Sequence, residues 1–152
     1  MFTFPLHLIV EPRIVSRAKI SSKKRLLETL AELLVHDRPE LDAGEVFERL
    51  LERERLGSTA LGHGIALPHA RMTHISDSLG ALVQVHEPVD FDNQPVDLAL
   101  ALLVPQEATD LHLQLLSNLA AMFSDPVLRN QLRTLEEPEL LLLTLQRWKS
   151  ST

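Results

Sequence analysis

Residues 57–71 read GSTALGHGIALPHAR. Three glycines and a proline interrupt this stretch too often for a helix, and its apolar residues make it unlike an ordinary surface loop. A helical pattern precedes it, and two strand-like apolar runs follow it. The stretch therefore marks the point where the chain passes from helices into a sheet. It also places a histidine, His69, directly after a proline, and the chemical role of this histidine has to be explained.

The flanking segments predict two helices and two buried strands. Leucines at helical spacing predict one helix from Ser22 that ends at residues 37–39 (DRP). A second helix is expected to begin after Asp42 and to run to about residue 55. Residues 81–86 (ALVQVH) and 98–104 (LALALLV) are almost continuously apolar, as strands buried on both faces are.

The last third of the chain is predicted to be helical. Thr109 is placed to cap a helix that runs to about residue 123. Asp125 and Pro126 form a cap and first-turn pair for the next helix, and Pro138 opens another that ends near residue 148.

This order of elements predicts the α/β class. Two helices, then strands, then three helices indicate a single-domain α/β/α sandwich, with a small mixed β-sheet between helical layers. We expect residues 1–152 to form this one domain, with its core at about residues 10–148.

The composition narrows the class of protein. The chain of 152 residues is 45% hydrophobic and 24% charged, as a globular protein is, and its net charge of −6 argues against nucleic acid as the main partner. The absence of cysteine excludes a disulfide framework and a thiolate metal site, and fits a cytoplasmic location. No apolar run reaches the roughly 18 residues of a membrane span, and we interpret the N-terminus as an ordered segment, not a signal peptide.

The sequence around His69 predicts a backbone with little conformational freedom, which would fix the position of this side chain. Residues 65–67 can form a short buried strand, and Pro68 pushes Leu67 towards an extended conformation. His69 would then emerge at the end of that strand. A neutral imidazole has a free ring nitrogen and can act as a nucleophile that accepts a phosphoryl group. A structural or metal-binding histidine remains open on these residues alone.

Two other kinds of site are less well supported by the pattern. His63, His69 and His74 are spaced H-x5-H-x4-H, which is not a standard zinc arrangement, and no cysteine or carboxylate cluster joins them or His112. A hydrolase would need a nucleophile elbow, which is absent here. Ser58 and Thr59 are therefore interpreted as residues that cap a turn or hold phosphoryl oxygens.

The stretch also carries a family resemblance. Residues 54–70 resemble the active-site signature of the fructose/mannitol-type enzyme IIA components of the bacterial phosphoenolpyruvate:sugar phosphotransferase system, with matches at Glu54, Leu61, Gly62, Ile65, Ala66, Leu67, Pro68, His69 and Ala70. Residues 22–24 (SKK), 53–59 (RERLGST) and 92–105 (DNQPVDLALALLVP) resemble the nitrogen-regulatory branch, enzyme IIA-Ntr. The resemblance covers nearly the whole chain and is weakest over the first dozen residues.

The resemblance implies a role for three residues. His69 would accept the phosphoryl group, His112 would lie beside it at a helix start, and Arg53 would stabilise the charge of the group, matching the family better than Arg55. The donor would be a phosphorylated carrier similar to HPr or NPr, itself charged by an enzyme I that uses phosphoenolpyruvate. No cofactor is implied.

Two positions depart from the nitrogen branch. His63 stands where that branch usually has Asn, which places another ionisable ring in the signature. Arg71 stands where Lys is common, and the positive charge is retained. Both are accessory candidates for the site.

The function that the resemblance favours is regulation by a cytoplasmic phosphoryl carrier, whose phosphorylation state would decide which target proteins it binds. Two alternatives remain: a binding-only regulator that is no longer phosphorylated, and the IIA component of a fructose or mannitol permease. No transporter segment or IIB-like cysteine site is present in the sequence, so an import role would need separate partners.

Overall fold

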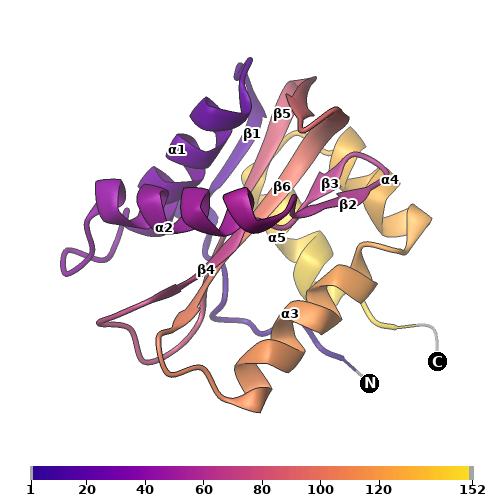
Figure 1. The fold of residues 1–152 in the computed structure, drawn as a ribbon. Helices are drawn as coiled ribbons and strands as arrows, with labels where there is room; N and C mark the ends of the chain where they lie inside the picture. The colour runs from indigo at the N-terminus through magenta and orange to yellow at the C-terminus, as the bar shows by residue number, and fades with distance from the viewer. Residues whose placement is uncertain (1, 151–152) are drawn as a thin grey trace.

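A mixed β-sheet lies between two layers of helices in the computed structural model, which describes residues 2–150 (Figure 1). Its strand order is β1-β5-β6-β3-β2, and β4 also pairs with β6. The described strands are β1 (Ile14–Ala18), β2 (Ala60–Gly62), β3 (Ile65–Ala66), β4 (His69–Met72), β5 (Leu79–Phe91) and β6 (Gln94–Pro105). The described helices are the 3-10 turn η1 (Glu11–Arg13), α1 (Lys23–Leu34), α2 (Ala43–Leu56), α3 (Asp110–Met122), α4 (Pro126–Thr134) and α5 (Pro138–Arg147). The predicted α/β/α sandwich is confirmed.

The centre of the sheet is a long β-hairpin formed by β5 and β6. Phe91 pairs with Gln94, and the two residues between them, Asp92 and Asn93, have φ angles of 55° and 69°. Two consecutive positive φ angles are typical of the tight turn whose twist matches paired strands. Both strands are longer than the apolar runs predicted, because pairing continues into the polar residues beside this turn.

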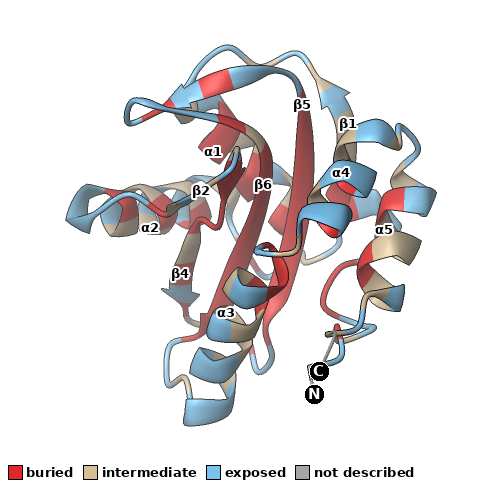
Figure 2. Ribbon diagram, turned by 90° about the vertical axis from the view of Figure 1, so that its right-hand side faces the viewer, coloured by how far each residue is buried: buried red, intermediate tan, exposed pale blue. Residues whose placement is uncertain are grey.

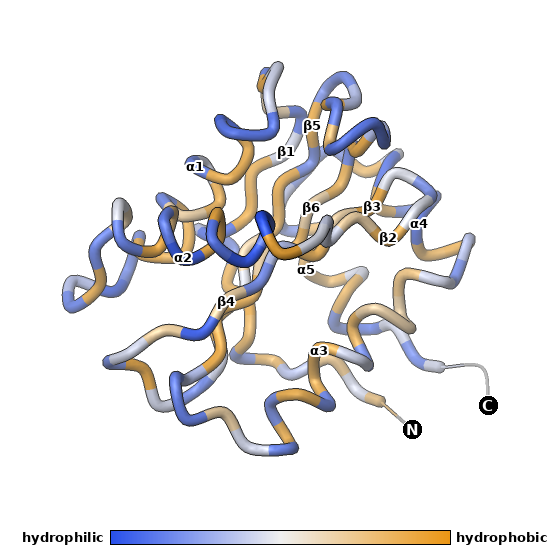
Figure 3. Tube along the Cα trace, in the orientation of Figure 1, coloured by the Kyte–Doolittle hydropathy of each residue, from blue (hydrophilic) through white to orange (hydrophobic). Residues whose placement is uncertain are grey.

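Alternate residues of β6 enter two separate cores. Leu98, Leu100 and Leu102 pack with residues of α3, α4 and α5, whereas Ala99, Ala101 and Leu103 pack with residues of α1 and α2. Figure 2 shows β5 and β6 buried along most of their length, and Figure 3 shows the same strands as hydrophobic away from the tip of their hairpin. The prediction of strands buried on both faces is confirmed.

Polar caps begin the helices where the sequence predicted them. The side chains of Ser22, Asp42 and Asp125 accept hydrogen bonds from the backbone N–H groups of the first turns of α1, α2 and α4. Helix α1 ends at Leu34, slightly before the predicted end, in turns that precede Pro39.

The N-terminal segment contributes more than the sequence predicted. Strand β1 pairs in parallel with β5 and was not recognised in the sequence, because it is only five residues long and carries Ser16 and Arg17. Phe4, Leu8 and Ile9 are fully buried, so the core begins before residue 10.

The predicted position of His69 at the end of a strand is wrong, because His69 begins β4. Both β3 and β4 pair in parallel with β6 in the same register, Ile65 with Leu98 and His69 with Leu102. Pro68 has no N–H group and interrupts the pairing, but the chain stays in line and the strand resumes at once. His69 is therefore held between paired segments on both sides.

No helix within residues 2–150 combines the length and the apolar character that crossing a membrane requires.

Candidate functional site

His69 is half-buried, and one of its ring nitrogens is already engaged. Its Nδ1 lies 2.8 Å from the carbonyl oxygen of Leu67. A carbonyl oxygen only accepts hydrogen bonds, so Nδ1 carries the proton and donates it. In the neutral ring this leaves the lone pair on Nε2. The geometry therefore leaves Nε2 as the ring nitrogen that is free to act as a nucleophile.

The surroundings of His69 keep its ring neutral. Burial lowers the pKa of His69 below its usual value, and the positive charge of Arg53 lowers it further. The hydrogen bond to Leu67 and the negative charge of Glu54 act in the opposite direction without reversing the shift. A neutral imidazole is the form that can attack phosphorus.

A hollow of about 550 Å³ opens beside His69, between α2, β4 and the start of α3. Its polar lining consists of Arg49, Glu52, Arg53, His69, Arg71, Gln106 and His112, and its apolar lining of Leu56, Ala70, Val104, Leu113 and Leu116. Three arginines thus line the hollow beside His69 in a protein whose net charge is −6. Guanidinium groups bind phosphoryl oxygens strongly, so the hollow suits a doubly charged anion.

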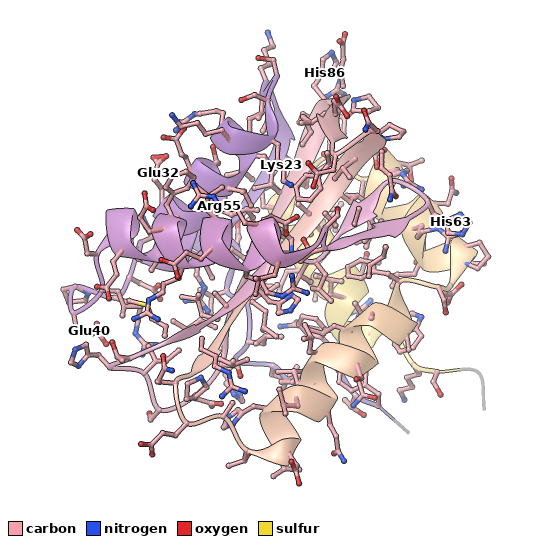
Figure 4. The ribbon with its side chains drawn as sticks, in the orientation of Figure 1. Lys23, Glu32, Glu40, Arg55, His63 and His86 are labelled. Atoms are coloured by element: carbon pink, nitrogen blue, oxygen red, sulfur yellow. The ribbon has the colours of Figure 1, made fainter. Side chains whose placement is uncertain are left out.

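The two candidate arginines of α2 are separated by the helix geometry. Arg53 is half-buried and lines the hollow, whereas Arg55 is exposed and does not. Residues two apart point to opposite sides of a helix, and Figure 4 shows Arg55 on the side of α2 opposite α3. Arg53 also donates a hydrogen bond of 2.9 Å from Nη1 to the carbonyl oxygen of Gly57, which holds it at the end of its helix.

Arg49 is a residue of the hollow that the sequence analysis missed. It lies one helical turn before Arg53, on the same face of α2, and is half-buried. Its spacing from Arg53 could have identified it, because residues four apart on a helix lie on the same face.

His112 lies in the first turn of α3, where Thr109 is the N-cap as predicted. The backbone N–H of Thr109 donates to Nδ1 of His112 over 3.1 Å. Nδ1 is therefore unprotonated, and the neutral ring of His112 carries its proton on Nε2. In the same hollow, His69 thus presents a lone pair on Nε2 and His112 an N–H donor on Nε2.

A second hollow, of about 310 Å³, lies on the other side of His69. Arg53, Ser58, Thr59 and His69 line it together with apolar residues of β2 and α3. Ser58 is exposed there. Thr59 is buried, and both its N–H and its hydroxyl are donated to the carboxylate of Glu54. These contacts favour a supporting role for Thr59 over a contact with phosphoryl oxygens.

The remaining accessory candidates are placed differently from each other. Arg71 lines the larger hollow and donates from Nη1 to the carbonyl oxygen of Gln106 over 3.1 Å. His63 is exposed at the turn between β2 and β3, beside α4 (Figure 4), where its carbonyl oxygen accepts from Arg133. It lines a different hollow, with Arg133 and Asp97. The structure therefore brings Arg71, but not His63, to the hollows around His69.

The histidines of the alternative metal site are not gathered. Within residues 2–150, no group of three or more His, Asp or Glu side chains lies close enough to hold a metal ion.

A family model supplies the comparison that decides the family. The model described as the phosphoenolpyruvate-dependent sugar phosphotransferase system, EIIA 2, matches residues 8–148. The chain belongs to this EIIA type 2 family. EIIA type 2 proteins are phosphotransferase components, which assigns this chain a general role in phosphoryl transfer.

Relatives of this EIIA type 2 protein carry the name nitrogen regulatory protein. The chain is 46% identical over 123 residues to the nitrogen regulatory protein of Pseudomonas aeruginosa, covering 79% of this chain and 80% of the relative. It is 42% identical over 130 residues to that of Escherichia coli, covering 83% and 79%. The predicted resemblance to the nitrogen-regulatory branch is confirmed.

Solved structures agree with this assignment. The crystal structure of IIA-Ntr from Neisseria meningitidis superimposes with a TM-score of 0.84 at 40% identity, covering 92% of this EIIA chain and 97% of that one. IIA mannitol from Escherichia coli superimposes with a TM-score of 0.74 at 21% identity, covering 90% and 98%, and shows the shared fold.

Proposed function

We propose that this protein is a cytoplasmic phosphoryl carrier that accepts a phosphoryl group on Nε2 of His69 and regulates target proteins according to its phosphorylation state. The observation that carries the proposal is the hydrogen bond from His69 Nδ1–H to Leu67, because it leaves Nε2 unprotonated in a hollow lined by three arginines. Its family, a component of the phosphotransferase system, supports the same chemistry.

The proposed step exchanges one N–P bond for another. The lone pair on Nε2 of His69 attacks the phosphorus of a phosphohistidine on an HPr-like or NPr-like carrier. The N–P bond of the carrier breaks, and its imidazole leaves neutral because its other nitrogen holds a proton. His69 then bears the phosphoryl group on Nε2, the proton on Nδ1 and a positive ring charge. The carbonyl oxygen of Leu67 stabilises that charge through the existing hydrogen bond.

The surrounding side chains have distinct roles in this step. Arg53 and Arg71 would neutralise the charge on the phosphoryl oxygens, and the Nε2–H of His112 would donate a hydrogen bond to them. Ser58, exposed in the smaller hollow, offers a further hydroxyl donor. None of these groups forms a covalent bond, so each would tune the rate and none would replace His69.

Regulation would follow from the surface around His69. Leu56 is 85% exposed and Leu113 is 45% exposed, and both line the larger hollow. A partner that covers these leucines would bury His69 as well. A doubly charged phosphoryl group at that position would weaken such a partner, because its charge would lose solvation. A solved complex of the Escherichia coli mannitol IIA with its phosphorylated IIB shows that a distant relative meets a phosphorylated protein partner.

The test is phosphoryl uptake measured by intact mass. The protein is incubated with phosphoenolpyruvate, enzyme I and an NPr-like carrier, and one acid-labile phosphoryl group is expected on the wild type. His69→Ala should take up none, because Nδ1 of His112, the other imidazole of the hollow, already accepts the Thr109 N–H and its Nε2 carries the proton. His63→Asn is the matched control and should be labelled like the wild type, since Asn tolerates the positive φ of 56° at that position.

Three outcomes would contradict the proposal, and each would favour a different function or acceptor. A wild type that stays unlabelled at every carrier concentration would favour the binding-only regulator. Labelling of His69→Ala at one site would move the acceptor elsewhere. Efficient onward transfer to a sugar-specific IIB protein would favour a permease component over a regulator.

A further inference from the structure

Glu54 is a buried carboxylate that touches neither hollow beside His69. It follows Arg53 on α2, is only 5% exposed, and is absent from the lining of both hollows. Burying a carboxylate is costly unless hydrogen bonds and a counter-charge compensate it. Its partners therefore indicate what this group does.

The first partner of Glu54 is Thr59, in the loop that follows α2. Oε1 of Glu54 accepts the backbone N–H of Thr59 over 3.1 Å, and Oε2 accepts the hydroxyl of the same residue. Two bonds to one residue fix both the position and the orientation of the loop at Thr59.

A chain of hydrogen bonds continues from Thr59 to the reactive ring. The carbonyl oxygen of Thr59 accepts the N–H of Leu67 over 3.0 Å. The carbonyl oxygen of Leu67 accepts Nδ1–H of His69 over 2.8 Å. The carboxylate and the imidazole are thus joined through the backbone of two residues, Thr59 and Leu67, each of which donates its N–H towards Glu54 and accepts at its C=O from the side of His69.

Lys23 of α1 links the carboxylate of Glu54 to the β5–β6 hairpin. Nζ of Lys23 lies 3.2 Å from Glu54 Oε1 and 2.6 Å from Asp92 Oδ2, and 4.4 Å above the ring of Phe91. Figure 4 shows Lys23 between α1, α2 and the tip of this hairpin. Glu54 therefore has a counter-charge and a fixed position, so it can hold the loop rigidly.

We propose that Glu54 is a positioning residue for phosphoryl transfer, which acts through Thr59 and Leu67 to keep His69 in the form protonated on Nδ1 and free on Nε2. If the Leu67 carbonyl moved away, the ring would lose the only bond that the described structure gives its Nδ1, and the Nε2-protonated tautomer would compete. That tautomer cannot attack with Nε2. This inference rests on the proposed function of His69.

The decisive variants differ in hydrogen bonding at nearly constant size. Glu54→Met removes both acceptors. Glu54→Gln is the conservative rescue, since its amide oxygen can accept the Thr59 N–H while its NH₂ donates to the Thr59 hydroxyl. Glu48→Met is the matched control, because Glu48 is an exposed residue of the same helix and lines neither hollow at His69.

Two measurements separate positioning from general stability. The first is the rate of phosphoryl uptake as a function of carrier concentration. Glu54→Met should lower kcat by about 10- to 100-fold, the range seen when the hydrogen-bond partner that orients a metal-bound histidine is lost. The KM for the carrier should not change, because Glu54 lines neither hollow. Glu54→Gln and Glu48→Met should stay near the wild-type kcat.

The second measurement is long-range proton–nitrogen NMR of the His69 ring without any carrier. The wild type should show protonation on Nδ1 only, and Glu54→Met a mixture of tautomers. If Glu54→Met fails to fold, Thr59→Val, which keeps the backbone bond and loses the hydroxyl bond, should show the same mixture more weakly.

Each other outcome has a defined meaning. A folded Glu54→Met with wild-type kcat and an unchanged Nδ1 signal would overturn the inference and leave Glu54 a purely structural residue. A Glu54→Gln as slow as Glu54→Met would also overturn it, because charge and not hydrogen bonding would then matter. A wild type that takes up no phosphoryl group would refute the proposed function alone, and the NMR result would still decide the role of Glu54.

Discussion

Arg53 donates a hydrogen bond of 2.9 Å from Nη1 to the carbonyl oxygen of Gly57, one turn further along the chain. The bond ties the guanidinium group to the point where α2 ends and the site loop begins. It also leaves the other nitrogens of the guanidinium group available to an anion in either hollow at His69. Arg53 thus holds the end of α2 in place and also supplies a positive charge to the proposed phosphoryl site.

Arg53→Ala should slow phosphoryl uptake by about 10²-fold, the usual loss when one preorganised donor to a developing charge is removed. The variant should remain folded, because its bond to Gly57 lies near the surface. Single-turnover labelling by the phosphorylated carrier measures the rate, and Arg55→Ala is the control. A normal rate in Arg53→Ala with a slow Arg55→Ala would show that the charge comes from the other arginine.

His112→Ala should still accept the phosphoryl group, but roughly 10- to 1000-fold more slowly, because one N–H donor is lost while the nucleophile remains. The change also removes the acceptor for the Thr109 N–H and loosens the first turn of α3. His112→Asn, whose amide oxygen can accept that N–H, separates the two effects. If His112→Asn restores the full rate, His112 acts through the helix cap and not through the phosphoryl group.

The pKa of His69 and the free energy of unfolding should both show that the ring of His69 is neutral in the folded protein. Its pKa is lowered below the usual 6.5, first by burial and also by Arg53, so the ring stays neutral as pH falls through 6.5. Between the two pKa values the unfolded chain binds the proton and the folded protein does not. The stability contribution of His69 is therefore full above pH 6.5 and is lost as pH falls through the folded pKa. An NMR titration of the ring measures the folded pKa of His69 directly, and a value at or above 6.5 would contradict the prediction.

Gly64→Ala should destabilise the protein more than Gly62→Ala. Both glycines have positive φ, 82° and 88°, so alanine costs about 1–2 kcal/mol of backbone strain at either position. At Gly64 the new Cβ would also meet the Arg133–Asp97 ion pair, lying 2.7 Å from Asp97 Oδ1, whereas nothing lies within 4 Å at Gly62. Urea unfolding of the two variants measures the difference. Equal losses would mean that the ion pair moves aside without cost.

Several features could be predicted because they depend on residues close together in the chain. Ser22, Asp42 and Asp125 cap helices through bonds that reach no more than three residues ahead, so the order of residues settles them. The burial of β6 on both faces follows from an apolar run that is nearly continuous. The candidate nucleophile could be named because Pro68 and the surrounding signature are local.

Other features depend on contacts between distant segments, and the sequence carries little trace of them. Strand β1 is short and partly polar, and it becomes a strand only because β5 offers a parallel partner. The hollow at His69 exists because α2, β4 and α3 border it, so Arg49 and His112 line the same hollow although they are far apart in the chain. Glu54 meets Lys23 only because α1 packs against both α2 and the β5–β6 hairpin. Local patterns specify helices and the candidate nucleophile, whereas the packing of the sheet and its helices selects the groups that surround it.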